Sequence, residues 1–411
     1  MQRTMIAPGK DSKEVVRKDY KYEYLCALCQ AIEDYTNSQE AQNANAYIYR
    51  RANLKYAIQR ELFFSFLNNV ALYDFYKKWK QNNLPARVEF KNELELSMAM
   101  LLCDNSLPKG SFAVKKDWAR DLAGDLFSIL RFLRNYPRGL FWNFKRIFKE
   151  RENARVVIYA VDEKFVRFLK PMTDALSVPF AYLLLKNARL KKGLFEKKVP
   201  YIDYGGMYVH SIPQARSREL NDFVRLVEYF DHVYECLKAS KPGCVVVIEG
   251  NAPANELINQ AGKMLSIPVV CIQQGWATFI HTGFRNMSYT KFLIWGAGFA
   301  KLLEPLNPDQ KFVPVGNYII EQEFSQDLSI RLNGKKGVTF FLQAPGSVTT
   351  KESWDLFLAL IQWTAGSFSQ WPVLLREHPS YALPSDERDL LLKYSNVYLV
   401  PSQEFSLSAV L

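Results

Sequence analysis

The residues best suited to chemistry follow an apolar run from Val245 to Ile248. Glu249, Gly250 and Asn251 come directly after that run. An uninterrupted apolar run of this kind is typical of a strand buried on both faces of a parallel sheet. Open α/β sheets bind their ligands at the carboxyl ends of such strands. A carboxylate there can take a proton from a substrate hydroxyl, so Glu249 is the candidate catalytic base and Asn251 a candidate substrate ligand.

A second polar turn follows the next predicted strand, residues 267–272. Gln274 and Gly275 lie in this turn, and residues 253–266 between the two strands are expected to form a helix. A strand–helix–strand unit brings both turns to the same edge of the sheet, which makes Gln274 and Gly275 candidate substrate-binding residues. Gln274 has no titratable group, so it can bind a substrate but cannot carry a proton.

Further candidates lie in later loops. His281 and Arg285 follow the second turn and are expected to contact substrate. Cations and helix N-termini can stabilise the negative charge of a phosphate group without a metal. The predicted strand 372–376 ends in suitable groups, and Gly346 lies in the loop after the preceding strand. The candidate nucleotide- and phosphate-binding residues are therefore Arg376, His378, Pro379 and Gly346.

Asp162 and Glu163 are alternative carboxylates for the general base. They follow another predicted strand, residues 156–161, which we expect to lie in the same sheet. From there onward, predicted strands alternate with predicted helices, and this alternation indicates parallel sheets of Rossmann type.

The chain divides into three predicted regions. Residues 1–150 show helical spacing of apolar side chains and form a helical N-terminal region. Residues 151–330 form a first Rossmann-like domain and residues 331–411 a second. The second has only about three predicted strands, fewer than the usual ~5 or 6, and the apolar pattern of residues 405–411 has no cap, so we expect this domain to be incomplete.

Local patterns predict several individual elements. One aromatic amphipathic helix is expected over residues 61–80 and another helix over residues 93–102. Residues 186–198 are expected to form a basic loop, and residues 201–206 a polar loop.

Composition excludes several classes of protein. The chain has 411 residues, of which 48% are hydrophobic and 23% charged, as in ordinary globular proteins. It contains no apolar run of the ~20 residues that a membrane-spanning helix needs and no signal-like N-terminus, so we expect a cytoplasmic location. The spacing of the six cysteines predicts neither a disulfide framework nor a metal site. The net charge of +11 predicts an anionic partner.

Residues 131–155 interleave basic and aromatic side chains. This pattern is typical of a segment on an anionic membrane surface, which would make the protein peripheral at the inner face of the cell membrane. A helix that buries its aromatic residues is an alternative. Nucleic-acid binding is a weaker interpretation of this segment, because the sequence has no recognised nucleic-acid module. We therefore expect no nucleic-acid partner.

Several motifs in residues 245–379 together resemble bacterial glycosyltransferases of the GT-B type that make surface polysaccharides. The group includes capsule and lipopolysaccharide sugar transferases, polysialyltransferases and Kdo transferases. The order of motifs is similar: an acidic residue and glycine after a strand, a glutamine–glycine turn, a Trp-Gly strand end, a Gly-Asn turn and a His-Pro pair. Here these are Glu249-Gly250, Gln274-Gly275, Trp295-Gly296, Gly316-Asn317 and His378-Pro379.

The resemblance implies tandem Rossmann domains, with the acceptor bound by the first and the nucleotide-sugar by the second. It implies a metal-independent, cofactor-free transfer of a sugar, with a CMP-sugar favoured, to a growing polysaccharide or glycolipid. Ile248 stands where sialyltransferase-like members have a second acidic residue, and Gln274 stands where related chains often have histidine. Three alternatives stay open: a UDP-N-acetylglucosamine 2-epimerase-like enzyme, a CDP-glycerol transferase, and a non-catalytic module of a polysaccharide-assembly protein.

Overall fold

The computed structural model confirms the predicted α/β class, because it contains a seven-stranded and a separate three-stranded parallel sheet, with helices between their strands. The chain forms two compact units, one of Ala27–Phe324 and one that combines Met1–Cys26 with Ser325–Leu411. The structure describes residues 20–84, 88–104, 112–114, 154–184, 188–198, 201–203, 223–275, 280–317, 337–343, 351–378 and 381–401.

The larger unit is built on a seven-stranded sheet in which every neighbouring pair of strands is parallel. The strand order is β11-β10-β9-β8-β5-β6-β7. The chain therefore builds outward from β5 in one direction, returns, and continues from β8 in the other, as in a Rossmann sheet. The strands are β5 (Val156–Tyr159), β6 (Phe180–Leu184), β7 (Tyr201–Asp203), β8 (Cys244–Ile248), β9 (Val269–Ile272), β10 (Lys291–Ile294) and β11 (Phe312–Pro314).

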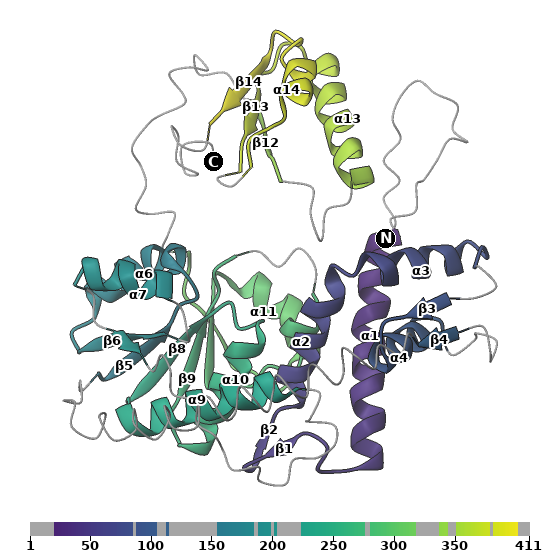
Figure 1. Cartoon of the computed structure of the whole chain (residues 1–411). Helices are drawn as coiled ribbons and strands as arrows, with labels where there is room; N and C mark the ends of the chain where they lie inside the picture. Colours follow the sequence, from purple (N-terminus) through teal and green to yellow (C-terminus); the bar gives the residue numbers. More distant parts are fainter. Residues whose placement is uncertain are drawn as a thin grey trace. The chain divides into compact units, whose positions relative to one another are not determined.

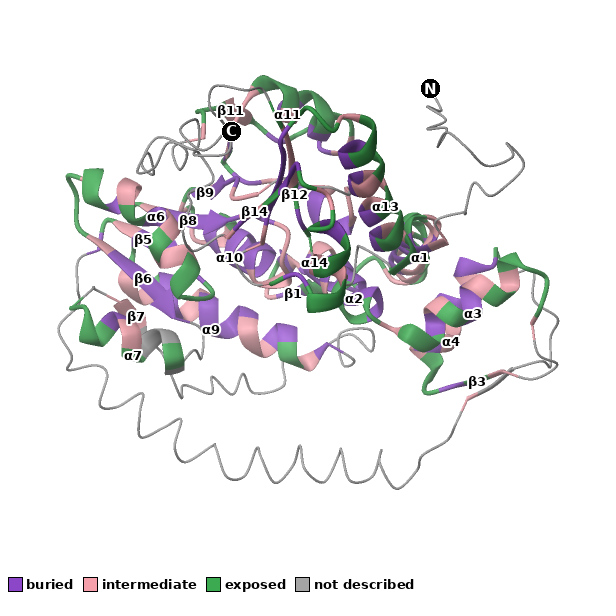
Figure 2. Ribbon diagram, turned by 90° about the horizontal axis from the view of Figure 1, so that it is seen from above, coloured by how far each residue is buried: buried purple, intermediate pink, exposed green. Residues whose placement is uncertain are grey.

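Helices cover both faces of this sheet. Val246 and Ile248 of β8 pack with Leu169 and Leu194, which come from α6 and α7. The alternate β8 residues point to the opposite face, where α10 contacts β8, β9 and α9. Figure 2 shows the strands largely buried, with helices buried on one side and exposed on the other. The helices are α6 (Glu163–Ala175), α7 (Ala188–Glu196), α9 (Val224–Ser240), α10 (Pro253–Met264) and α11 (Ala297–Leu303), with the short η1 (Thr282–Phe284) and η2 (Glu304–Leu306).

The described part of the N-terminal region, which lies between residues 20 and 114, is mainly helical and belongs largely to the larger unit (Figure 1). Its helix α2 packs against α10 and also touches η1. The elements are α1 (Tyr20–Gln42), β1 (Ile48–Tyr49), β2 (Ala52–Asn53), α2 (Lys55–Leu67), α3 (Val70–Lys80), β3 (Val88–Phe90), α4 (Glu93–Leu102) and β4 (Phe112–Val114).

Three local predictions were wrong. The helix expected over residues 61–80 is broken, because the Asn69 side chain accepts a hydrogen bond from the Leu72 backbone and starts α3 as a new helix. The basic loop expected over residues 186–198 contains α7, in which Arg189, Lys192 and Glu196 are exposed while Leu194 enters the core. Part of the loop expected at 201–206 is the edge strand β7, which was too short to recognise as a strand.

The smaller unit has a three-stranded parallel sheet with the order β12-β13-β14, the strand number expected from the sequence. Trp354, Leu358 and Ile361 of α13 pack with Val373 and Leu375 of β13 in its core. Its elements are β12 (Val338–Phe341), α13 (Lys351–Ser367), β13 (Val373–Arg376), α14 (Ser385–Leu391) and β14 (Val397–Val400).

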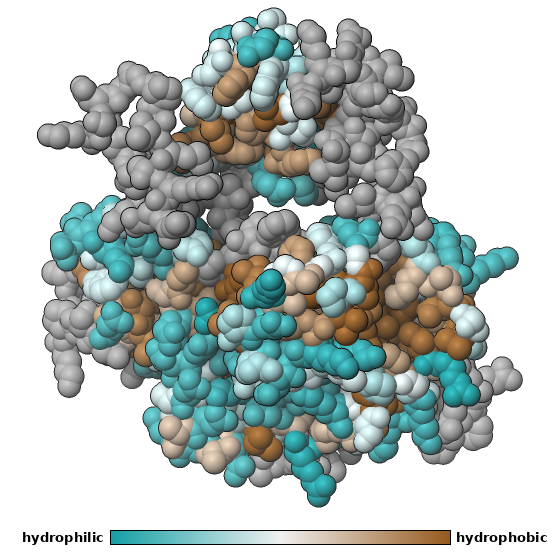
Figure 3. All heavy atoms as spheres, turned by 180° about the vertical axis from the view of Figure 1, so that it is seen from behind, coloured by the Kyte–Doolittle hydropathy of each residue, from teal (hydrophilic) through white to brown (hydrophobic). Residues whose placement is uncertain are grey.

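Membrane contact was predicted for residues 131–155, most of which lie outside the described residues. No described helix combines the length and apolarity needed to cross a membrane. On the face shown in Figure 3, hydrophilic residues alternate with apolar patches.

Candidate active site

The candidate site lies at the point of the larger sheet where the chain changes direction. Strands β5 and β8 are neighbours there, with Ile158 opposite Val246. In open α/β sheets this switch point, at the carboxyl ends of the strands, is where ligands bind. Ile248 of β8 is level with Ile272 of β9, so Glu249 and Gln273 leave the sheet at the same edge.

The backbone at Glu249 is strained. Glu249 has a φ of 65°, in the left-handed region that side-chain-bearing residues rarely occupy. The Gly250 N–H donates to the Ile248 carbonyl over 2.8 Å, which closes a three-residue γ-turn with Glu249 at its centre. This form of γ-turn, with positive φ, is rare and costs on the order of 1–3 kcal/mol. Strain of this kind concentrates at functional sites because the surrounding structure must hold it.

The Glu249 carboxyl group is half-buried beside Gly275. A Cβ atom on Gly275 would lie 3.5 Å from Glu249 Oε1, so a glycine leaves room for the carboxylate. Burial raises the pKa of Glu249, although a hydrogen bond from the Gly275 backbone and the charge of Lys164 partly offset this. Among the described residues Glu249 makes no ion pair within 4.0 Å. Its raised pKa makes Glu249 a stronger base than an ordinary carboxylate.

The two alternative carboxylates have local structural roles. The Asp162 side chain accepts from the Phe165 N–H over 3.2 Å and caps α6. Glu163 forms an exposed ion pair with Lys197 of the α7 end. Of the three strand-end carboxylates, Glu249 is the one left available for a substrate.

Asn251 and His281 are brought together by a close backbone approach at Gly283. A Cβ atom on Gly283 would lie 2.3 Å from the Asn251 carbonyl oxygen and 2.7 Å from His281 Cε1. Only glycine fits this position, so the η1 turn can pack directly on the loop that follows Glu249. Two residues predicted separately from the sequence thus lie at one place, and neither the hydropathy pattern nor the motif order indicated that contact.

His281 is a neutral imidazole. It stacks on Phe63 of α2 with a ring separation of 4.5 Å, and its Nδ1 accepts a hydrogen bond from the Gly283 N–H over 2.9 Å. Burial, together with the charges of Arg60 and Arg285, lowers the pKa of His281 to about 4. With Nδ1 accepting, the ring proton is on Nε2, so His281 can donate a hydrogen bond but is a poor base at neutral pH.

Of the adjacent glutamines, Gln273 has the structural role. Its Oε1 accepts from the Trp295 N–H over 2.9 Å, and its Nε2 donates to the Gly275 carbonyl over 3.0 Å. Gln273 therefore ties the β9 turn to the end of β10. The half-buried Gln274 makes no hydrogen bond with the described residues and keeps its amide for a ligand. The sequence drew attention to Gln274 and gave no sign of the part played by Gln273.

Arg285 is paired with the helical region. It forms an ion pair of 2.9 Å with Glu33 of α1, so its charge is already partly neutralised. In the smaller unit, Arg376 is buried and its Nη1 donates to the Glu377 carbonyl over 3.2 Å. The His378 carbonyl accepts from the Tyr381 N–H over 3.0 Å, which folds the chain back after β13. Pro379 and Gly346 lie outside the described residues.

Metal ligands do not gather at this site. Within the part of the chain that the structure describes, no three His, Cys, Asp or Glu side chains form a group that could hold a metal ion.

No protein-family model and no curated protein sequence matches the chain significantly. Solved structures do show similarity. MurG of Acinetobacter baumannii has a TM-score of 0.36 at 10% identity, and the match covers 60% of this chain and 65% of that one, less than two thirds of its length. The UDP-GlcNAc 2-epimerase of Neisseria meningitidis bound to UDP-GlcNAc has a TM-score of 0.36 at 14% identity, covering 62% and 73%. The lipopolysaccharide outer core galactosyltransferase WaaB, in its apo form, has a TM-score of 0.37 at 14% identity, covering 60% and 67%.

Proposed function

We propose that the chain is a metal-independent glycosyltransferase of the GT-B type. It would move a sugar from a nucleotide-activated donor, with a CMP-sugar favoured, to a growing surface polysaccharide or glycolipid. The observation that carries the proposal is Glu249, which lies on a strained turn at the switch point of a Rossmann sheet. Its carboxyl group has a raised pKa and forms no ion pair with the residues that the structure describes.

In the proposed reaction, the Glu249 carboxylate accepts the proton of an acceptor hydroxyl. The hydroxyl oxygen forms a bond to the anomeric carbon of the donor sugar, and the bond from that carbon to the phosphate oxygen breaks. Asn251, Gln274 and the Nε2–H of His281 would hold the hydroxyls of the substrate. Within the smaller unit, Arg376 and His378 would be the candidates for binding a nucleotide phosphate.

The proposed acceptor also implies a cellular location. A glycolipid acceptor is met at the inner face of the cell membrane, where residues 131–155 would make peripheral contact with anionic lipid.

A nucleotide panel tests the proposal. Thermal unfolding of the whole chain is followed with CMP, UDP, CDP-glycerol and UDP-N-acetylglucosamine, each added separately. A ligand at ~100 times its Kd stabilises the folded state by about 2.7 kcal/mol, which raises Tm measurably. Protection by CMP alone supports a CMP-sugar donor, whereas protection by UDP-N-acetylglucosamine or CDP-glycerol selects the epimerase-like or glycerol-transferase alternative. If no nucleotide protects the chain, the enzymatic proposal fails and a non-catalytic module remains.

A further inference from the structure

We propose that Tyr289 and Arg60 form a positioning device that holds the turn carrying Glu249 in its strained conformation. Arg60 belongs to the N-terminal helical region, so this region would act directly on the candidate active site. The inference rests on the proposed role of Glu249, but its test needs neither a substrate nor turnover.

The first contact of the device is a hydrogen bond to the turn itself. The Tyr289 hydroxyl donates to the Gly250 carbonyl over 2.7 Å, and both residues are buried. Gly250 has a φ of +73°, and a Cβ atom there would lie 2.7 Å from Cys271 Sγ and 3.0 Å from the Tyr289 ring. The ring and the thiol thus enclose Gly250, while the hydroxyl fixes its peptide orientation. On the other side, Asn255 Nδ2 donates to the Ile248 carbonyl over 2.6 Å.

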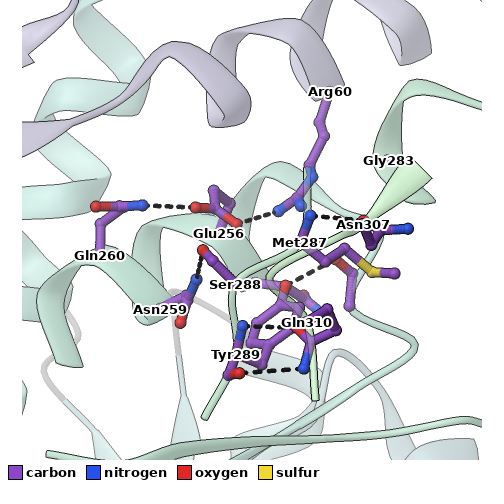
Figure 4. A network of polar contacts seen from close by, with 12 residues as sticks. Arg60, Glu256, Asn259, Gln260, Gly283, Met287, Ser288, Tyr289, Asn307 and Gln310 are labelled. Carbon is purple, nitrogen blue, oxygen red and sulfur yellow. Dashed lines mark hydrogen bonds and ion pairs between the residues drawn. The ribbon is translucent and has the colours of Figure 1, made fainter. Parts of the chain in front are cut away.

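Tyr289 is itself held in place by two amide side chains (Figure 4). Its N–H donates to Gln310 Oε1 over 2.8 Å, and Gln310 Nε2 donates back to the Tyr289 carbonyl over 3.1 Å. Two residues earlier, the Met287 N–H donates to Asn307 Oδ1 over 2.7 Å. Both the N–H and the carbonyl group of Tyr289 are therefore hydrogen-bonded to Gln310. These bonds fix the backbone before β10 and direct the Tyr289 ring toward Gly250.

Arg60 completes the device from α2. It is fully buried, and its Nη1 pairs with Glu256 Oε2 of α10 over 2.7 Å, while Gln260 Nε2 donates to Glu256 Oε1 over 2.7 Å (Figure 4). Although burial alone lowers it, the pKa of Arg60 is raised because Glu256 and the Tyr289 hydroxyl favour its charge. The Nε and Nη2 atoms of Arg60 are buried and have no hydrogen-bond partner among the described residues, so the effect of Arg60 on the Tyr289 hydroxyl is electrostatic.

The Tyr289 hydroxyl keeps its proton at neutral pH. Burial is the main cause of a pKa for Tyr289 that lies well above its ordinary value. The other charged or titratable groups that face Glu249 are Lys164 from α6 and the Cys271 thiol from β9, and burial likewise keeps that thiol protonated. The pH dependence that Glu249→Gln removes therefore reports on the Glu249 carboxyl group itself.

The test compares two tyrosines. Tyr289→Phe removes the hydroxyl at the turn, and Tyr182→Phe removes the hydroxyl of another buried tyrosine, on β6. The free energy of unfolding is measured against pH for each variant, with and without Glu249→Gln, and the difference between each pair of curves gives the pKa of Glu249.

We expect Tyr289→Phe to lower the pKa of Glu249 toward its ordinary value, because a relaxed turn exposes the carboxyl group to water. Tyr182→Phe should leave that pKa unchanged. If both variants lose stability alike and neither moves the pKa of Glu249, Tyr289 is a structural residue only and the proposal is overturned.

A second arm tests Arg60. The double variant Arg60→Met, Glu256→Met removes the buried pair together, so that no lone charge is left inside and the chain can still fold. We expect the pKa of Glu249 to move in the same direction as in Tyr289→Phe. An unchanged pKa would remove Arg60 from the device. Failure of every nucleotide to protect the parent protein would instead refute the proposed function, and it would leave these pKa comparisons intact.

Discussion

Strands β8 and β13 are alike in sequence and differ in how their ends are built. Each is a buried parallel strand followed by charged and polar residues. After β8, the chain enters a strained turn whose carboxylate has no ion pair. After β13, the Glu377 carboxylate accepts from the Leu383 N–H over 3.1 Å and lies 3.6 Å from Arg388. The carboxylate after β13 therefore has local partners, whereas the turn after β8 is held in a strained conformation by its surroundings.

This difference fits two different roles, that of a general base and that of a phosphate-binding site. A general base must stay reactive, so its environment must keep it from forming the ion pair that would lower its pKa. A phosphate-binding platform needs charge at a fixed place and gains from a relaxed backbone. We therefore propose that the end of β8 provides the general base and the end of β13 provides the phosphate-binding groups. Substitutions should then disrupt the two roles independently.

Glu249→Gln is expected to have the largest effect. Removing a general base should lower turnover by roughly 10²–10⁴-fold while leaving the affinity for the donor nucleotide largely unchanged. Turnover is measured as nucleotide release from the donor identified by the thermal panel. Asp174→Asn is the matched control, because Asp174 is exposed at the far end of α6 and pairs only with Lys170. A Gln variant that retains most of its turnover would remove Glu249 from the mechanism.

The features of this site that could be predicted from the sequence are those that depend on local sequence patterns. The central strand, its turn and its polar residues were predictable, because a run of β-branched residues and a following glycine are local patterns. Tyr289 and Gln273 were not predictable, because their hydrogen bonds join segments that are distant in sequence or carry no periodic signal. Arg60 was hidden for the same reason, since its partner Glu256 is 196 residues away.

The pH dependence of stability should single out His281. Its pKa falls from 6.5 to about 4 in the folded protein, so below pH 6.5 the unfolded chain binds a proton that the folded chain does not. Stability is therefore fully present above pH 6.5 and is lost as pH falls toward 4, by roughly 3 kcal/mol at ~1.4 kcal/mol per pH unit. His281→Gln should flatten this part of the unfolding curve.

Glu249 should change the stability with pH in the opposite direction to His281. Its raised pKa means that the folded state keeps a proton that the unfolded state has released, so stability from this group is lost as pH rises through the folded pKa. Glu249→Gln should remove that loss, while the acid-side loss from His281 persists. Identical curves for both single variants would show that neither group has the environment described here.

His378→Ala tests the binding half of the comparison. A charge-assisted contact to phosphate is worth about 1.5–3 kcal/mol, so nucleotide affinity should fall about ten-fold or more. The fold-back after β13 should persist, because alanine keeps the backbone carbonyl that accepts from the Tyr381 N–H. Calorimetric titration with the protecting nucleotide gives the affinity, and an unchanged Kd would exclude His378 from the phosphate site.

The smallest expected effect is membrane contact by residues 131–155. Their basic side chains should bind anionic lipid weakly and reversibly, because the attraction is screened over ~8 Å at physiological ionic strength. Sedimentation of the whole chain with vesicles of anionic or neutral lipid, at low and high salt, measures it. Arg131→Gln, Arg134→Gln, Arg138→Gln should weaken binding more than the equal charge change Lys77→Gln, Lys78→Gln, Lys80→Gln at the end of α3. If the two triple variants lose binding equally, only the net charge of +11 matters and the segment has no special role.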